Sequence, residues 1–249
     1  MICLTVDVTN PGQFFGCCGV FELAQRLWPG ATAHFEDGHF IVSAGDLEDL
    51  VMKTAQAHIE VQEPANQTSS ALRLAGPFDL RLDWWKSERG LKTWAGRMSV
   101  DRIANSLKQD LPNTLSKGFF DDGHVVLGAD GKKVEPYYFD GRRGATALPL
   151  DVGFSPDALS LETVAFSATE FFTLVGIQRF RPSAVRLRLR LYRYRAWRMP
   201  LPVTLAALAA ANAIPDSGPL FQFESAFRTD QRKHKAFSPA NPQQGDGHE

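Results

Sequence analysis

Hydrophobic and polar positions alternate along the chain with two periods, and each period predicts one type of element. In residues 17–28 the apolar side chains recur three, four and seven positions apart, which is the spacing of one helical face. Residues 78–84 alternate apolar and polar positions one by one, which is typical of a strand with one buried face. Helices predicted from such patterns cover 11–28, 45–61, 99–111, 156–180 and 203–213. Predicted strands cover 2–8, 34–35, 39–42, 72–74, 78–84 and 185–199.

The order of these elements predicts an α+β fold, because strands and helices do not alternate strictly enough for a doubly wound sheet. We expect a mixed, mostly antiparallel sheet with packed helices. The opening order of strand, helix and two strands is compatible with a ferredoxin-like or RRM-like core. Residues 1–227 are predicted to form a single domain, and the polar loop at 63–70 is where a subdivision would fall. Residues 228–249 are polar and predicted to be a disordered tail.

Composition narrows the class of protein. The chain has 249 residues, and 44% of them are hydrophobic, which is enough to build a core. The chain has no run of 18 apolar residues, and its start lacks the features of a signal peptide. Its three cysteines do not have the spacing of a disulfide framework. We therefore expect a soluble, cytoplasmic protein that does not bind a membrane.

The charge distribution adds a candidate binding surface. The formal net charge is only −1, yet residues 185–199, "VRLRLRLYRYRAWRM", contain six arginines and no acid. The whole interval between Glu170 and Asp216 holds eight arginines and no acidic residue. A row of guanidinium groups suits a phosphate backbone, because each group stays charged and binds phosphate oxygens in pairs. The alternative interpretation is a solvated strand face that pairs with acids from elsewhere.

The alternation within this stretch breaks at Leu191–Tyr192. A one-residue bulge there would turn Tyr192 and Tyr194 towards the core. It would also gather the arginines on one surface, namely Arg186, Arg188, Arg190, Arg193 and Arg195. Without a bulge the arginines divide over two faces, and the tyrosines could stack on nucleic-acid bases.

A second stretch mixes aromatic and basic residues. In residues 83–98 the indole rings of Trp84, Trp85 and Trp94 lie close in sequence to Lys92 and other basic residues. Such a mixture indicates nucleic-acid contact or a protein-binding hot spot. The alternative is a core tryptophan at a strand end, followed by a polar loop.

A third candidate is the pair Arg142 and Arg143, which lies between glycines in a predicted loop. The two guanidinium groups could hold a phosphate. They could equally pair with Asp140 or Asp151.

Catalytic signals are weak. The chain contains neither a Walker motif nor a GxSxG motif, and its histidines lack zinc-ligand spacing. The string "FFDDGH" offers Asp121, Asp122 and His124, but it lacks the fuller clusters of a metal nuclease. We predict no catalytic residue, no metal and no cofactor. A metal-dependent nuclease or RNA-processing enzyme that uses these three residues is the competing hypothesis.

Four longer strings carry a family resemblance. They are "DVTNPGQFFGCCGVFELAQRLWPGA", "RLDWWKSERGLKTWAGRM", "DGRRGATALPLDVGFSPDAL" and "EFFTLVGIQRFRP". Together they resemble the small Csb/Csx-type subunits of type I-U (I-G) CRISPR systems, over about residues 5–210. The resemblance leaves two roles open. One is a large-subunit equivalent that lies near the PAM, which is the short DNA flank that licenses targeting. The other is a backbone-type RNA binder.

This resemblance implies a subunit of a Cascade-like effector complex that contacts guide RNA, target DNA or both, beside other subunits of the complex. It implies no catalysis here, because a separate nuclease-helicase cleaves the target in such systems. Protein contacts in such complexes hold backbone and shape, while base pairing reads the sequence. A structural adaptor that docks other subunits through its tryptophans is the third hypothesis.

Overall fold

A computed structural model describes residues 1–62, 69–94, 98–116, 118–143, 164–186, 190–227 and 235–243. These residues form helices and antiparallel sheets, so the predicted α+β class is confirmed. The helices are α1 (Pro11–Leu27), α2 (Leu47–Gln56), α3 (Val100–Asp110), α4 (Ser167–Gly176) and α5 (Val203–Ala210). Three short 3-10 helices are η1 (Trp84–Lys86), η2 (Leu111–Leu115) and η3 (Gly141–Arg143). None of the helices in the described part of the chain is long and apolar enough to cross a membrane.

The first sheet contains the strands nearest to the N-terminus. Its strands are β1 (Ile2–Thr5), β2 (Thr32–Glu36), β3 (His39–Val42) and β9 (Leu201–Pro202). They pair antiparallel in the order β1-β3-β2-β9. A ferredoxin-like core would add the strand that follows α2 to this sheet. That strand, β4 (Ile59–Val61), instead starts a separate sheet with β5 (Leu72–Leu74) and β6 (Leu80–Leu82).

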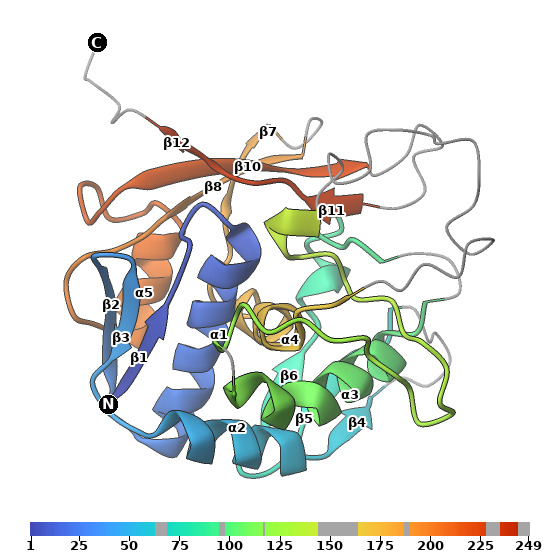
Figure 1. Cartoon of the computed structure of the whole chain (residues 1–249). Coiled ribbons are helices and arrows are strands. Elements are labelled where there is room, and N and C mark those ends of the chain that lie inside the picture. Colours follow the sequence, from blue (N-terminus) through green and yellow to red (C-terminus); the bar gives the residue numbers. More distant parts are fainter. Residues whose placement is uncertain are drawn as a thin grey trace.

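The third sheet lies across the top of the molecule in Figure 1, above α1 and α4. Its strands are β7 (Ser183–Arg186), β8 (Leu191–Arg195), β10 (Leu220–Phe227), β11 (Lys235–Phe237) and β12 (Asn241–Gln243). They follow the order β11-β10-β8-β7, with β12 also paired to β10. All of these pairs are antiparallel.

Helices α1 and α4 lie side by side at the centre of the fold (Figure 1). Their close approach requires glycine on both helices. A Cβ on Gly19 would lie 1.9 Å from the carbonyl oxygen of Phe172, and one on Gly176 would lie 2.1 Å from that of Phe15. Because α1 is covered by a helix and by sheets, even its predicted polar residue Glu22 is only 1% exposed.

Helix boundaries follow local signals better than they follow periodicity. Helix α1 begins where predicted, because Asn10 caps it by accepting the N–H of Gly12 at 3.0 Å and Pro11 fills its first turn. Helix α3 also agrees with its prediction. The predicted helix 45–61 is too long, because its last residues pair with β5 as strand β4. The predicted strand 78–84 is shorter, because η1 begins at Trp84.

The prediction of one continuous strand over 185–199 is wrong. Strands β7 and β8 pair antiparallel, so the chain reverses between Arg186 and Leu191. Arg190 has a φ of 51°, in the left-handed region that reversals use. The break in the alternation at Leu191–Tyr192 therefore marks the start of β8, the second strand of the β7–β8 hairpin. An irregularity exists, but it lies in β7 between Ala184 and Arg186, and not at Leu191–Tyr192.

The prediction of a disordered tail over 228–249 is wrong for residues 235–243. Strands β11 and β12 both pair with β10. Phe237 is fully buried, and its ring lies 4.9 Å from that of Phe223 between centroids. Polar composition did not reveal this order, because backbone pairing and one aromatic anchor hold the segment.

Candidate nucleic-acid interface

Strand β8 separates its side chains cleanly between two faces. Tyr192 and Tyr194 are 1% and 0% exposed and point to the core. The ring of Tyr194 stacks on that of Phe14 of α1, with centroids 4.2 Å apart. Its hydroxyl donates to the carbonyl of Val8 at 2.7 Å. The tyrosines therefore face the core, as the interpretation with a bulge predicted, and they are not free to stack on bases.

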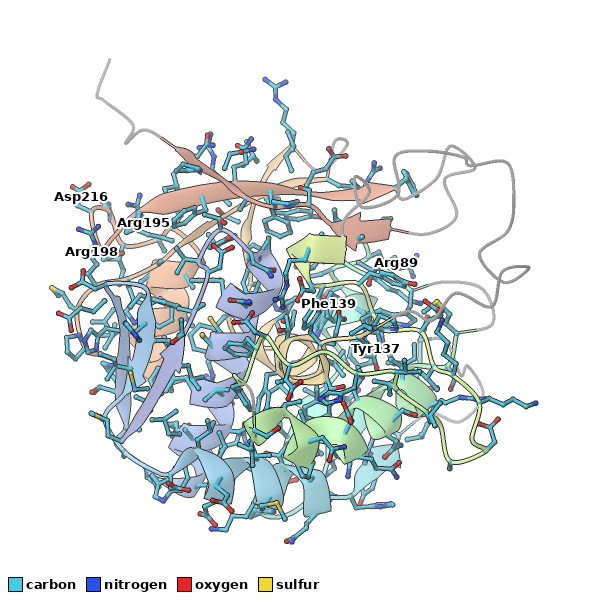
Figure 2. The ribbon with its side chains drawn as sticks, viewed as in Figure 1. Arg89, Tyr137, Phe139, Arg195, Arg198 and Asp216 are labelled. Atoms are coloured by element: carbon cyan, nitrogen blue, oxygen red, sulfur yellow. The ribbon has the colours of Figure 1, made fainter. Side chains whose placement is uncertain are left out.

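Arg193 and Arg195 lie on the opposite, outward face of β8. Arg193 Nε donates to the amide oxygen of Gln222 at 3.1 Å. Arg195 donates to the amide oxygen of Asn212 at 3.0 and 2.8 Å, and to the carbonyl of Gly218 at 2.6 Å. Figure 2 places Arg195 at the edge of the molecule, near Arg198. All of these acceptors are neutral, so they orient the two guanidinium groups without cancelling their charge.

The remaining arginines of the stretch differ in position. Arg186 is exposed at the end of β7 and pairs across the hairpin with Leu191, so the register places it on the same face as Arg193. Arg190 donates to the carbonyl of Ser225 at 2.8 Å and stacks 4.2 Å above the ring of Phe227. Arg188 lies outside the described residues. Three of the predicted arginines therefore share the outward face, which we call the arginine face: Arg186, Arg193 and Arg195.

A cluster of cations adjoins this face where β8 begins. Arg190 directly precedes β8, and its charge acts on Lys235 of β11. Lys235 Nζ donates to the carbonyls of Arg89 and Gly90 at 3.0 and 2.9 Å. Lys92 donates to Ser69 Oγ at 2.8 Å. Figure 2 shows Arg89 close to β11. We call these residues the cation cluster: Arg89, Lys92, Arg190 and Lys235.

In the part of the chain that the structure describes, the cation cluster has little negative charge to balance it. Burial, together with the charges of Arg190 and Lys92, lowers the pKa of Lys235 to about 8. Burial and the charge of Arg89 also lower the pKa of Lys92. Within the described residues, the cluster forms one ion pair, between Arg190 Nη2 and Glu224 Oε1 at 3.7 Å. Cations held together in this way provide a place for an anion.

Lys235 was missed by sequence reasoning, which assigned it to the tail. The available signal was a short basic run, "RKHK", at 232–235. It could not be interpreted without knowing that this segment returns to β10.

The interpretation of Trp84, Trp85 and Trp94 as an interaction surface is corrected by their burial. Their exposed fractions are 0%, 1% and 2%, and their rings pack edge to face with centroids 5.4 to 5.8 Å apart. The indole N–H of Trp84 donates to the carbonyl of Leu174 at 2.9 Å. These rings form part of the core, because η1 and the following loop turn all three inward.

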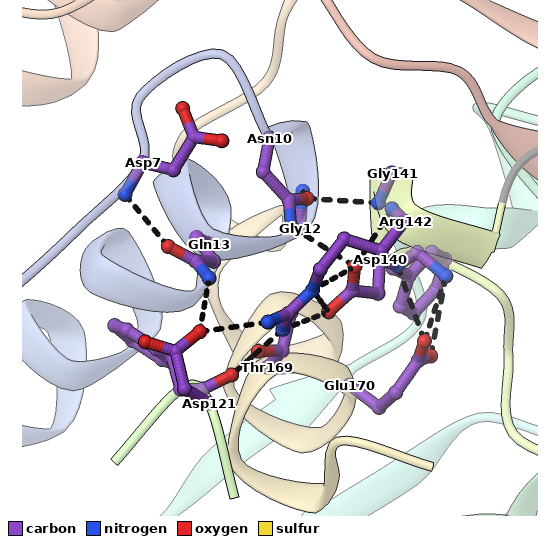
Figure 3. A network of polar contacts seen from close by, with 12 residues as sticks. Asp7, Asn10, Gly12, Gln13, Asp121, Asp140, Gly141, Arg142, Thr169 and Glu170 are labelled. Atoms are coloured by element: carbon purple, nitrogen blue, oxygen red, sulfur yellow. Dashed lines mark hydrogen bonds and ion pairs between the residues drawn. The ribbon is translucent and has the colours of Figure 1, made fainter. Parts of the chain in front are cut away.

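Arg142 is engaged by partners within the same chain, although its side chain is 35% exposed (Figure 3). It bonds Asp140 at 2.6 Å and Asp121 at 2.7 Å, and it stacks 3.6 Å from the ring of Phe166. Pairing with Asp140 was one of the two predicted alternatives, and it leaves this guanidinium poorly placed to hold a phosphate. Nothing is described for the Arg143 side chain or for Asp151.

The same network holds the segment 139–143 against the two central helices. Asp140 and Glu170 are fully buried carboxylates. Asn10 donates to Asp140 at 2.9 Å, and Glu170 accepts the backbone N–H groups of Phe139 and Asp140 at 3.1 Å (Figure 3). Each buried carboxylate thus has several donors, which is the arrangement that burial of charge requires.

The residues of the nuclease hypothesis have different partners in the structure. Asp121 pairs with Arg142, as described above. Asp122 is 5% exposed and lies 3.2 Å from His124 Nε2. Within the described ranges, no group of three or more potential ligands is placed to hold a metal ion.

Comparisons with models of protein families, with curated proteins and with solved structures gave no match for this chain.

Proposed function

We propose that this chain is a non-catalytic subunit that binds the sugar–phosphate backbone of RNA or DNA through its arginine face. One observation carries the proposal. Arg193 and Arg195 are held side by side on an outer sheet face, and their acceptors are amide and carbonyl oxygens. Their positive charge is therefore available to an external anion.

The chemistry of the face favours the phosphate backbone over the bases. RRM-type sheets read bases with exposed aromatic rings, but Tyr192 and Tyr194 of this sheet are buried. What remains outside is guanidinium and amide chemistry, together with the carboxylate of Glu224, which pairs with Arg190. Guanidinium and amide groups position a backbone without reading its sequence. The cation cluster extends the same chemistry past the start of β8.

The resemblance to type I-U (I-G) subunits supports a more specific version of this proposal. In that version the chain works in the cytoplasm within a Cascade-like complex, beside guide RNA, target DNA and other subunits. Base pairing would select the target, and the arginine face would hold the backbone of one strand.

The salt dependence of binding tests this proposal. Arg193 and Arg195 are both replaced by Gln, and binding of RNA and DNA oligonucleotides is titrated at several salt concentrations, with the chain alone and in its complex. If both arginines contact phosphates, the slope of log K against log salt falls by about 1.4 for a single strand and about 1.8 for a duplex.

A matched pair of substitutions controls for net charge. Arg73→Gln with Arg102→Gln removes the same charge from exposed arginines that already pair with carboxylates. We expect this control to keep the salt slope, and both double variants to keep the wild-type melting temperature within a few degrees. An unchanged slope in the Arg193/Arg195 variant, or an equal drop in both, would overturn the role of the arginine face.

A further inference from the structure

A second basic site lies away from the arginine face, in a cleft between α1, β6 and the chain that follows α4. Its volume is about 360 Å³. The residues that line it are Glu22, Arg26, Leu80, Arg81, Gln178 and Arg179. Leu80 is the one apolar side chain among them, so the cleft suits a small and strongly polar ligand.

Glu22 fixes the orientation of two of the arginines. Its carboxylate is 1% exposed. It accepts Arg26 Nε at 3.0 Å and Arg179 Nη2 at 3.2 Å. Arg26 Nη1 donates to the carbonyls of Phe78 and Asp79 at 2.7 and 3.2 Å. These bonds hold the guanidinium planes of Arg26 and Arg179 still, which lowers the entropic cost of binding a further partner.

Several donors in the cleft remain unused. Among the described residues, neither Arg26 Nη2 nor Arg179 Nη1 makes a hydrogen bond. Arg81 uses only its Nε, which donates to Asp83 at 2.7 Å, and its side chain is 58% exposed. The three arginines thus offer free N–H groups from α1, from β6 and from the segment after α4.

We propose that this cleft binds a phosphate monoester. Such a group carries a charge of about −1.5 to −2 and three terminal oxygens, so it can accept from three arginines at once. The three arginines and Glu22 sum to a formal charge of +2 within the lining. A carboxylate or a phosphodiester has only two such oxygens. The monoester can belong to a small metabolite or to the 5′ end of a nucleic acid.

Calorimetric titration of the full chain tests the site. The probes are inorganic phosphate, adenosine 5′-monophosphate, and one oligonucleotide with either a 5′-phosphate or a 5′-hydroxyl. We expect adenosine 5′-monophosphate to bind at millimolar concentration or below. A preference for the 5′-phosphate oligonucleotide over its 5′-hydroxyl form identifies a nucleic-acid end as the source. Equal binding of the two oligonucleotides, with retained mononucleotide binding, identifies a small metabolite.

Two variants separate binding from folding. Arg81→Gln removes an exposed cation, and Arg179→Lys keeps the charge opposite Glu22 but removes the free η donor. Each should weaken phosphate binding about tenfold or more, since a charge-assisted hydrogen bond is lost. Arg73→Gln, on the neighbouring strand β5, is the matched control and should bind as the wild type does.

Three outcomes would overturn the site. They are the absence of phosphate binding by the wild type at millimolar concentrations, unchanged binding by folded Arg81→Gln, and an equal loss in Arg73→Gln. The Arg193/Arg195 variant of the arginine face should bind mononucleotides normally, so the two proposals can fail independently.

Discussion

Residues 83–98 and 185–199 are both rich in aromatic and basic residues, but the fold orders their described basic residues differently. The tryptophans Trp84, Trp85 and Trp94 lie in the core, whereas Arg193 and Arg195 lie on an outer sheet face. In both stretches the aromatic rings turn inward. The difference is that β8 sends its basic residues to one ordered surface, because alternate residues of a strand face opposite sides. The 3-10 helix and loop of the first stretch have no such alternation.

The comparison shows that composition alone does not identify a binding surface. Burial of an aromatic ring stabilises the folded state strongly, so aromatic side chains pack in the core wherever the backbone allows it. A basic side chain becomes part of a surface when the element that carries it also fixes its direction. Three changes test this distinction, from the largest expected effect to the smallest.

Trp84→Ala should destabilise the protein more than the other two changes. Trp84 is fully buried, contacts the rings of Trp85 and Trp94, and donates to Leu174. We expect the free energy of unfolding to fall by about 3–5 kcal/mol, as for other buried tryptophans, measured by chemical denaturation. Trp84→Phe keeps a ring and should lose less. A stable Trp84→Ala variant with impaired nucleic-acid binding would restore the interpretation of this stretch as a surface.

Tyr194→Phe should have an intermediate effect. The Tyr194 hydroxyl is buried and donates to the carbonyl of Val8, and burial raises its pKa well above the usual value. Its loss should lower the free energy of unfolding by about 1 kcal/mol. Tyr192→Phe is the control, because among the described residues the Tyr192 hydroxyl makes no hydrogen bond. Equal losses in the two variants would show that the contact with Val8 adds nothing.

Replacement of Lys235 should have the smallest effect, which appears in how the free energy of unfolding depends on pH. Its pKa of about 8 lies below the usual 10.5, because of burial and the charges of Arg190 and Lys92. Between these two values the unfolded chain binds more protons than the native one, so raising the pH stabilises the fold. Relative to Lys235→Met, the wild type should gain on the order of 1 kcal/mol between about pH 7 and 9.5, allowing for partial exposure.

Thermal or chemical unfolding of both proteins over this pH range measures the difference. Parallel stability curves for the two proteins would mean that Lys235 is not held among uncompensated cations. Binding of nucleic acid to the cation cluster would favour charged Lys235, so affinity should then fall as the pH rises through about 8.

Much of the fold could be predicted where local signals agree. Asn10 and Pro11 set the start of α1, and the turn after Glu36 sets the β2–β3 hairpin. The candidate site was predicted only in part. Arg193 and Arg195 were expected on one face and lie on one face, but Arg142 proved to be paired with two aspartates, and Lys235 was assigned to a tail. The pairing of Arg142 with Asp121 joins residues 21 positions apart, and no local pattern specifies such a contact.

The sequence by itself determined the α+β class, the amphipathic character of β8 and the concentration of arginine in an interval without acids. These are local properties, set by side-chain spacing and by the conformational preferences of single residues. Only the tertiary structure decided which charges are neutralised. Glu22 reaches Arg179 across 157 positions, while Arg193 donates to the amide of Gln222, and Lys235 returns to the sheet beside Arg190. A cation keeps its full charge for an external anion when packing gives it neutral acceptors, and packing is a property of the whole chain.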